Sequence, residues 1–185
     1  PLDHRAPRRR WATMLGVVTT DAQVAPALLQ RALGVVTDAT FNAISVDGEC
    51  STNDCVFALA NGASGVAIGE RDLPLLVEAL TRVCEPLAIG IVRGGEGATK
   101  LVTIEVRGGR TDAEAKQAAR AVANSPLVKT AIHGADPNWG RLVAVMGRAG
   151  VDFELQRARV RIGDVELFAN GRPFDERAAQ ASKHL

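Results

Sequence analysis

The sequence predicts a mixed α/β fold, because strand-like and helix-like patterns alternate along its 185 residues. Two patterns are the clearest. Lys100–Arg107 alternates apolar and polar residues, which is typical of a half-buried strand. Between Leu73 and Leu87 the apolar residues recur at intervals of three and four, which is the spacing of one helix face. No repeat or low-complexity linker interrupts this alternation, so we expect an α/β or α+β class and one domain, or most of one.

A strand followed by a helix is predicted at the start of this pattern. Leu15–Thr19 is a short apolar run that suits a buried strand. Thr20 or Asp21 has the side chain of a helix N-cap, and Gly34 is a typical stop, so we expect a helix between them. Its apolar face would consist of Ala25, Leu28, Leu29 and Ala32.

Two contrasting segments follow. Thr40–Asn61 is dense in short polar residues and has a turn signal at Asp47-Gly48, so it predicts a mixed, turn-rich segment. The clearest helix opens at Asp72, and Pro74 fits its first turn because that amide has no helical partner. The apolar face of this helix is Leu73, Leu76, Val77, Leu80, Val83, Cys84 and Leu87.

The second half of the chain continues the alternation. The strand Lys100–Arg107 would place Val102, Ile104 and Val106 on one face. Thr111–Glu114 is a capping box, and small residues give the helix behind it a packing face. Gly163-Asp164 is a two-residue hairpin signal between the strands Arg159–Ile162 and Val165–Phe168, and Asp175–Lys183 closes the pattern as a short helix.

Composition excludes several classes of protein. The net charge is +1 and aromatic residues make up only 4%, with no tyrosine, which argues against nucleic acid and anionic membrane surfaces as partners. No apolar run reaches the roughly 18 residues that a membrane helix needs. We therefore expect a soluble protein that binds neither nucleic acid nor membrane.

The three cysteines, Cys50, Cys55 and Cys84, are an odd number and favour reduced thiols in a cytoplasmic protein. Cys50 and Cys55 would need His133 to form a metal site, and their spacing fits no usual zinc pattern. We expect no metal, and free cysteines that are buried or half-buried.

Residues 1–11 differ from the rest, since they hold five arginines or histidines outside any apolar pattern. We expect a disordered basic arm there and a domain over residues 12–185. The pair Ala12-Thr13 follows this arm. If the bond between them breaks, Thr13 gains a free α-amine that can act as the base for its own hydroxyl. Taken alone, the pair suits an ordinary strand residue equally well.

Three further stretches are candidates for chemistry, and each has a structural alternative. Ser45–Asp54 is either a loop ordered by local hydrogen bonds or the wall of an active site. Gly94–Lys100 resembles a phosphate loop only weakly, and its Glu96 is either a counter-charge for a substrate ammonium or part of a solvated turn. In Gly134–Arg141 we favour structural anchoring, with an Asp136–Arg141 pair as one way to fix the turn.

Five segments in this order resemble the ornithine acetyltransferase family, also called glutamate N-acetyltransferases. The segments are Ala12–Leu15, Thr19–Ala22, Ser45–Asp54, Gly94–Lys100 and Asp136–Arg141. The resemblance covers residues 12 to about 175 and corresponds to the family's β chain, which is released when the precursor cuts itself. It implies an α+β layered sandwich, a fold type shared with the self-cleaving β-peptidyl aminopeptidases.

The resemblance implies a two-step acetyl transfer in arginine biosynthesis. Acetyl would pass from N2-acetylornithine to Thr13 and then to glutamate, giving ornithine and N-acetylglutamate. The α-amine of Thr13 would serve as general base and general acid, and Glu96 would contact the substrate. Self-cleavage at Ala12–Thr13 would use the same hydroxyl. No cofactor is implied, although some family members accept acetyl-CoA as a substrate.

The resemblance also implies a partner, the α chain, which supplies the oxyanion hole, in a heterotetramer of two α and two β chains. The family's contributions from its far C-terminus fall beyond Leu185, so we expect the 12–185 domain to be incomplete and inactive by itself. The arginine-rich Arg5–Trp11 also departs from the family pattern. Two alternatives stay open: a self-cleaving aminopeptidase-type hydrolase, and an inactive fragment that only binds a partner.

Overall fold

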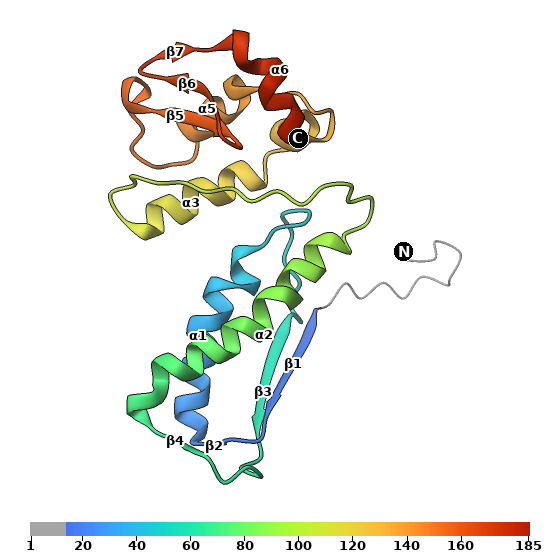
Figure 1. Ribbon diagram of the computed structural model, residues 1–185, viewed down its shortest axis with the longest axis vertical. Coiled ribbons are helices and arrows are strands. Elements are labelled where there is room, and N and C mark those ends of the chain that lie inside the picture. Colours follow the sequence, from blue (N-terminus) through green and yellow to red (C-terminus); the bar gives the residue numbers. More distant parts are fainter. Residues whose placement is uncertain (1–13) are drawn as a thin grey trace, which may run out of the picture. The chain divides into compact units, whose positions relative to one another are not determined.

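A computed structural model describes residues 14–185, so Ala12, Thr13 and the predicted basic arm of residues 1–11 lie outside the described residues. The chain divides into two compact units, the first ending at Ala98 and the second running from Thr99 to Leu185 (Figure 1). Each unit contains both helices and strands, which confirms the predicted mixed class. None of the helices in the described residues is long and apolar enough to cross a membrane.

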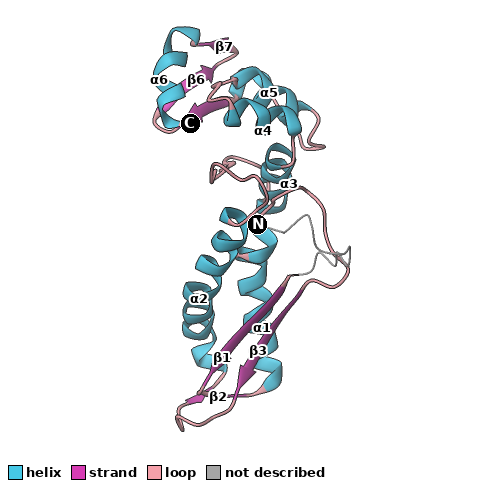
Figure 2. Cartoon of the chain, turned by 90° about the vertical axis from the view of Figure 1, so that its right-hand side faces the viewer, coloured by secondary structure: helices cyan, strands magenta, loops and turns pink. Residues whose placement is uncertain are grey.

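The first unit is a small parallel sheet covered on one face by two helices (Figure 2). Strand β1 (Leu15–Thr20) pairs with β3 (Cys55–Ala60) in parallel register, from Leu15 opposite Cys55 to Thr20 opposite Ala60. The short strands β2 (Gln23–Val24) and β4 (Ala67–Ile68) form a second parallel pair. The helices are α1 (Pro26–Ala39) and α2 (Leu73–Arg93), and 3₁₀ turns lie at Phe41–Ala43 and Glu70–Asp72.

The core of this unit lies between the helices and one face of the β1–β3 sheet. Val18 of β1 is 5% exposed and packs with buried residues of both helices. The buried helix residues in this cluster are Leu29, Ala32 and Val36 of α1 with Leu76, Leu80, Cys84 and Ala88 of α2. The opposite face of the sheet carries Val17 and Phe57, which are 60% and 53% exposed in the described chain.

Helix α2 confirms the clearest sequence prediction, with Pro74 in its first turn. Its buried stripe repeats every four residues from Leu76 to Ala88, and the helix runs past the predicted face to Arg93. Val83 and Leu87, which we assigned to the apolar face, are 50% and 46% exposed. The apolar residues of α2 therefore extend over more of the helix surface than α1 and the sheet cover.

Helix α1 differs from its prediction at both ends. Thr20 and Asp21 do not cap it, because the Thr20 hydroxyl accepts the amide of Ala22 at 3.2 Å and β2 follows before the helix begins. The predicted stop at Gly34 is also wrong. The helix continues through that glycine to Ala39, because Val36 extends the apolar stripe and is fully buried.

The second unit combines three helices with an antiparallel sheet. The helices are α3 (Asp112–Ala123), α4 (Pro126–His133) and α5 (Trp139–Gly147). The strands β5 (Arg159–Ile162), β6 (Val165–Ala169) and β7 (Arg172–Pro173) follow in that order across the sheet. The chain closes with 3₁₀ turns at Leu155–Arg157, Asp175–Arg177 and Ser182–His184 and the short helix α6 (Ala178–Ala181).

Three local predictions in this unit are confirmed. Thr111 caps α3, since its hydroxyl accepts the amide of Glu114 at 3.2 Å. Gly163 has a φ of +55° in the turn between β5 and β6, which the predicted hairpin requires. The closing segment from Asp175 is helical, as expected.

The predicted strand at Lys100–Arg107 is wrong for the described chain. The segment belongs to no sheet among the described residues, although Ile104 packs on the cluster of Val122, Val128 and Val145. The alternation of inward and outward residues is present from Thr103 to Arg107. A strand also needs a neighbour that accepts and donates its backbone hydrogen bonds, and the sequence pattern cannot supply one.

Candidate functional site

The start of β1 carries the candidate site, because Thr13 directly precedes the first described residue, Met14. Two hydrogen bonds hold the backbone of Met14. Its amide donates to the Asp54 carboxylate at 2.8 Å, and its carbonyl accepts the amide of Cys55 at 2.9 Å. The Met14 side chain packs against the core of the first unit. The chain is therefore fixed by backbone and side chain at the residue that follows the predicted nucleophile.

The loop Ser45–Asp54 leads into this point and is ordered by local hydrogen bonds. The Asp47 carboxylate accepts the amide of Glu49 at 2.9 Å, and Gly48 adopts a φ of +87° in the same turn. The Asp54 carboxylate accepts a second amide, that of Ser51, at 3.3 Å. The predicted local ordering is confirmed, and the loop ends beside the start of β1.

Glu96 lies on an exposed turn that follows α2. The amide of Ala98 donates to the carbonyl of Gly95 at 3.0 Å, and Gly97 has a φ of +72°, which favours glycine. Gly95 lies against the loop Ser45–Asp54, because a Cβ placed on it would be 2.9 Å from Cγ1 of Val46. The structure thus brings together two of the predicted segments, the Glu96 turn and the loop that ends at Asp54.

Lys100, the last residue of the phosphate-loop candidate, has a structural partner instead. Its ammonium donates to the carbonyls of Ile132 and His133 at 2.7 and 3.2 Å, at the C-terminal end of α4. Thr99 hydrogen-bonds His133 at 3.2 Å in the same place. A cation at a helix C-terminus is favourable because the exposed carbonyls carry partial negative charge. These contacts speak against a phosphate loop at Gly94–Lys100.

Gly134–Arg141 serves as a structural anchor, as predicted, but with different pairs. Asp136 accepts the side-chain amide of Asn138 at 3.0 Å, and Asn138 caps α5 through the amide of Arg141 at 3.1 Å. Arg141 donates to the carbonyl of Leu127 at 2.7 Å, so the proposed Asp136–Arg141 pair is wrong. Trp139 stacks on Phe168 with ring centroids 4.9 Å apart.

The cysteines are free, and only Cys84 is buried, where burial raises the pKa of its thiol. Cys50 and Cys55 are exposed, which corrects the prediction that all three are buried or half-buried. Within residues 14–185 no group of three or more His, Cys, Asp and Glu side chains is arranged to hold a metal ion.

The sequence did not predict the Asp54–Met14 contact, although Asp54 belongs to the candidate loop Ser45–Asp54. The two residues are 40 positions apart, and periodicity says nothing about side-chain contacts at that distance. One signal was present. Asp54 directly precedes the apolar run Cys55–Ala60, and a short carboxylate at the start of a strand is well placed to accept amides of a neighbouring strand.

Comparison with known proteins agrees with the resemblance found in the sequence. The family model described as the ArgJ family matches residues 7–185. The "Arginine biosynthesis bifunctional protein ArgJ" of Nitratidesulfovibrio vulgaris is 52% identical over 164 residues, which is 89% of this chain and 42% of that protein. The protein of the same name from Synechococcus sp. is 53% identical over 174 residues, which is 91% of this chain and 42% of that protein.

A solved structure confirms the fold. The crystal structure of "Arginine biosynthesis bifunctional protein argJ" from Bacillus halodurans matches with a TM-score of 0.88 and 40% sequence identity, covering 92% of this chain and 82% of that chain. The chain spans 42% of the length of the two curated relatives named above. The family model covers nearly all of its residues. The chain therefore belongs to the ArgJ family.

Proposed function

We propose that the complete protein transfers an acetyl group from N2-acetylornithine to glutamate, as a glutamate N-acetyltransferase of arginine biosynthesis. The observation that carries this proposal is the 52% identity to a relative named as a bifunctional arginine-biosynthesis protein. The ordered start of β1 supports it, since the Met14 backbone that follows Thr13 is fixed by Asp54 and Cys55.

In the proposed reaction, the Thr13 hydroxyl attacks the acetyl carbonyl of N2-acetylornithine. The α-amine of Thr13 takes the hydroxyl proton and passes it to the departing amine, so that ornithine leaves and an acetyl ester forms on Thr13. The amine of glutamate then attacks the ester and releases N-acetylglutamate and the free hydroxyl. This chemistry needs no cofactor, and acetyl-CoA is a possible second acetyl donor.

Glu96 has the proposed role of holding the cationic amine of the substrate. Its turn is exposed, and it packs through Gly95 on the loop that ends at Asp54. A hydrogen bond to a charged group contributes roughly 1.5–3 kcal/mol, which is enough to orient a small amino-acid substrate. We propose Glu96 as a substrate-binding residue on this basis.

The nucleophile is proposed to arise by self-cleavage between Ala12 and Thr13, which yields an α chain and a β chain. We propose that these chains form a heterotetramer of two α and two β chains in the cytoplasm, where the three free cysteines stay reduced. The exposed apolar face of the β1–β3 sheet supports a covering partner, because parallel sheets are normally buried on both faces. Without the α chain, we expect the 185-residue chain to be inactive.

Three proteins test the proposal: the complete wild type, Thr13→Ala and Thr13→Ser. Release of ornithine from N2-acetylornithine is measured with and without glutamate, and cleavage is followed by intact mass. We expect glutamate-dependent release and cleavage in the wild type, neither in Thr13→Ala, and reduced rates in Thr13→Ser. Release that does not depend on glutamate would indicate a hydrolase, and an uncleaved, inactive wild type would indicate a binding protein.

A further inference from the structure

Val46 is an exposed apolar side chain in an otherwise polar loop, and it lies against the Glu96 turn. The other residues of Ser45–Asp54 are polar or charged, apart from one glycine and one cysteine. Val46 is 40% exposed, and its Cγ1 would be 2.9 Å from a Cβ placed on Gly95. The valine methyl groups therefore lie against the backbone directly before Glu96, so the apolar side chain and the carboxylate border the same small region of the first unit.

The structure on either side holds Val46 in place. Ile44, two residues earlier, packs against the core of the first unit. Asp47, the next residue, accepts the amide of Glu49 at 2.9 Å. Opposite Val46, the amide of Gly95 continues the hydrogen bonding of the last turn of α2. A side chain that its neighbours hold in place can discriminate between substrates of different size.

The proposed acetyl donor, N2-acetylornithine, has two groups that this region can recognise. Its acetyl group reacts at Thr13 in the proposed mechanism. Its side chain ends in an ammonium that three methylene groups separate from the α-carbon, and Glu96 has the proposed role of holding this ammonium. The methylene groups next to the ammonium would then lie beside Val46, because the valine borders the same turn.

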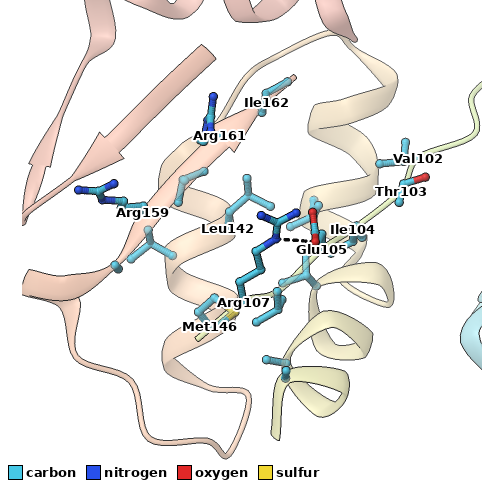
Figure 3. Close-up of a pocket in the computed structure, with 18 of the residues that line it drawn as sticks. Val102, Thr103, Ile104, Glu105, Arg107, Leu142, Met146, Arg159, Arg161 and Ile162 are labelled. Atoms are coloured by element: carbon cyan, nitrogen blue, oxygen red, sulfur yellow. Dashed lines mark hydrogen bonds and ion pairs between the residues drawn. The ribbon is translucent and has the colours of Figure 1, made fainter. Parts of the chain in front are cut away.

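A cavity in the second unit offers a different environment. Its volume is about 1300 Å³, whereas small-molecule pockets measure roughly 300–1,000 Å³, so it is larger than one amino-acid substrate needs. Arg107 pairs with the carboxylate of Glu105 on its wall (Figure 3), and Arg110 pairs with Glu114 at 2.7 Å. Because these two carboxylates are already neutralised, the cavity suits a small cationic substrate poorly.

We propose that Val46 sets the chain length of the amino acid that donates the acetyl group, by closing the space beside an ammonium held on Glu96. This inference rests on the proposed function. A donor with three methylene groups fits between Thr13 and Glu96, a longer one presses against Val46, and a shorter one does not reach the carboxylate. One methylene group in an apolar site changes kcat/KM by roughly 10- to 200-fold.

Three donors that differ by one methylene group test this role on the complete, cleaved protein with glutamate as acceptor. They are the N2-acetyl derivatives of 2,4-diaminobutyrate, ornithine and lysine. We expect the wild type to prefer the ornithine donor to the lysine donor by at least about 10-fold in kcat/KM, and Val46→Ala to lower this preference by about 10-fold. Val46→Ile should shift the preference toward the shortest donor. Val35→Ala, at a valine 55% exposed on α1, is the matched control and should keep the wild-type preference.

A fourth donor separates recognition of length from recognition of charge. N2-acetylnorvaline has the carbon chain of the ornithine donor without its ammonium. We expect Glu96→Gln to lose most of the preference for the ornithine donor over this neutral donor, and Val46→Ala to keep it. Loss of both preferences in Val46→Ala would show that the valine only supports the Glu96 turn, which would overturn its role in chain length.

The remaining outcomes separate this inference from the proposed function. An unchanged chain-length preference in the folded Val46 variants, or an equal loss on all donors, would overturn the role of Val46 while glutamate-dependent transfer by the wild type stands. A wild type that transfers acetyl from none of the donors would overturn the proposed function, and this inference with it. Intact mass and urea unfolding show which variants are cleaved and folded, and the opposite shifts expected for alanine and isoleucine allow either variant to decide.

Discussion

The Asp54 carboxylate accepts the amide of Met14 at 2.8 Å, which links the end of a polar loop to the residue after the proposed nucleophile. The same carboxylate accepts the amide of Ser51 at 3.3 Å. One side chain therefore orders the loop and fixes the backbone where β1 begins. If Thr13 acts as a nucleophile, Asp54 is a positioning residue for it.

Removing this carboxylate should lower kcat more than it changes KM. In the complete protein, we expect Asp54→Ala to reduce kcat by roughly 10- to 100-fold, because small displacements of a reacting group are costly. Asp54→Asn keeps one acceptor oxygen and should retain most of the activity. Glu78→Gln on the exposed surface of α2 is the control. Folded Asp54→Ala protein with wild-type kcat would show that the bond does not position Thr13.

Two glycines near the end of α2 should respond in opposite ways to alanine. At Gly95 the new Cβ would lie 2.9 Å from Val46 and 3.2 Å from the carbonyl of Val92, so we expect a loss of about 1–3 kcal/mol in unfolding free energy and a higher KM. At Gly90, inside the helix, nothing lies within 4 Å, so alanine should stabilise by about 0.5–1 kcal/mol. Urea unfolding checks both. Equal changes in unfolding free energy for the two variants would contradict the packing of the Glu96 turn on the loop Ser45–Asp54.

Lys100→Met should destabilise the second unit, and neither the wild type nor this variant should bind a nucleotide. The variant removes the cation that donates to the carbonyls of Ile132 and His133, and we expect a loss of about 0.3–1 kcal/mol. Calorimetric titration with ATP should detect no binding to the wild type or to the variant. Binding to the wild type that the variant loses would restore the phosphate-loop interpretation.

The three cysteines should label at different rates. Cys50 and Cys55 are exposed and should react with a maleimide in the native chain, whereas Cys84 should react only on unfolding. Because burial raises the pKa of the Cys84 thiol above its ordinary value of 9.0, the unfolded chain loses this proton first. Stability should therefore fall as the pH rises above 9, and Cys84→Ala should remove that component. Fast native labelling of all three would contradict the buried position.

The elements that the sequence predicted well are those set by local chemistry. Pro74 and the four-residue apolar repeat define α2, Thr111 caps α3, and Gly163 fits its hairpin. Gly34 shows the limit of a local rule. Glycine usually ends a helix, but the burial of Val36 in the next turn outweighs the cost of one glycine in α1.

What the sequence missed depends on residues far apart along the chain. The parallel pairing of β1 with β3 and the Asp54–Met14 bond join residues 40 positions apart. Lys100–Arg107 has the alternating burial of a strand from Thr103 to Arg107, but no described strand pairs with it, so it forms no sheet in the described chain. Of the predicted site residues, Glu96 lies on an exposed turn, and its role as a counter-charge for the substrate stays a prediction. Ala12 and Thr13 lie outside the described residues, so their roles stay predictions as well.

The most direct test is to find where the acetyl group goes. The complete, cleaved protein is mixed with N2-acetylornithine in the absence of glutamate, quenched in acid, digested and analysed by mass spectrometry. We predict one acetyl group, as an ester on the side chain of Thr13, that disappears when glutamate is added before the quench. An acetyl group on any other residue, or none on a protein that turns over, would contradict the account.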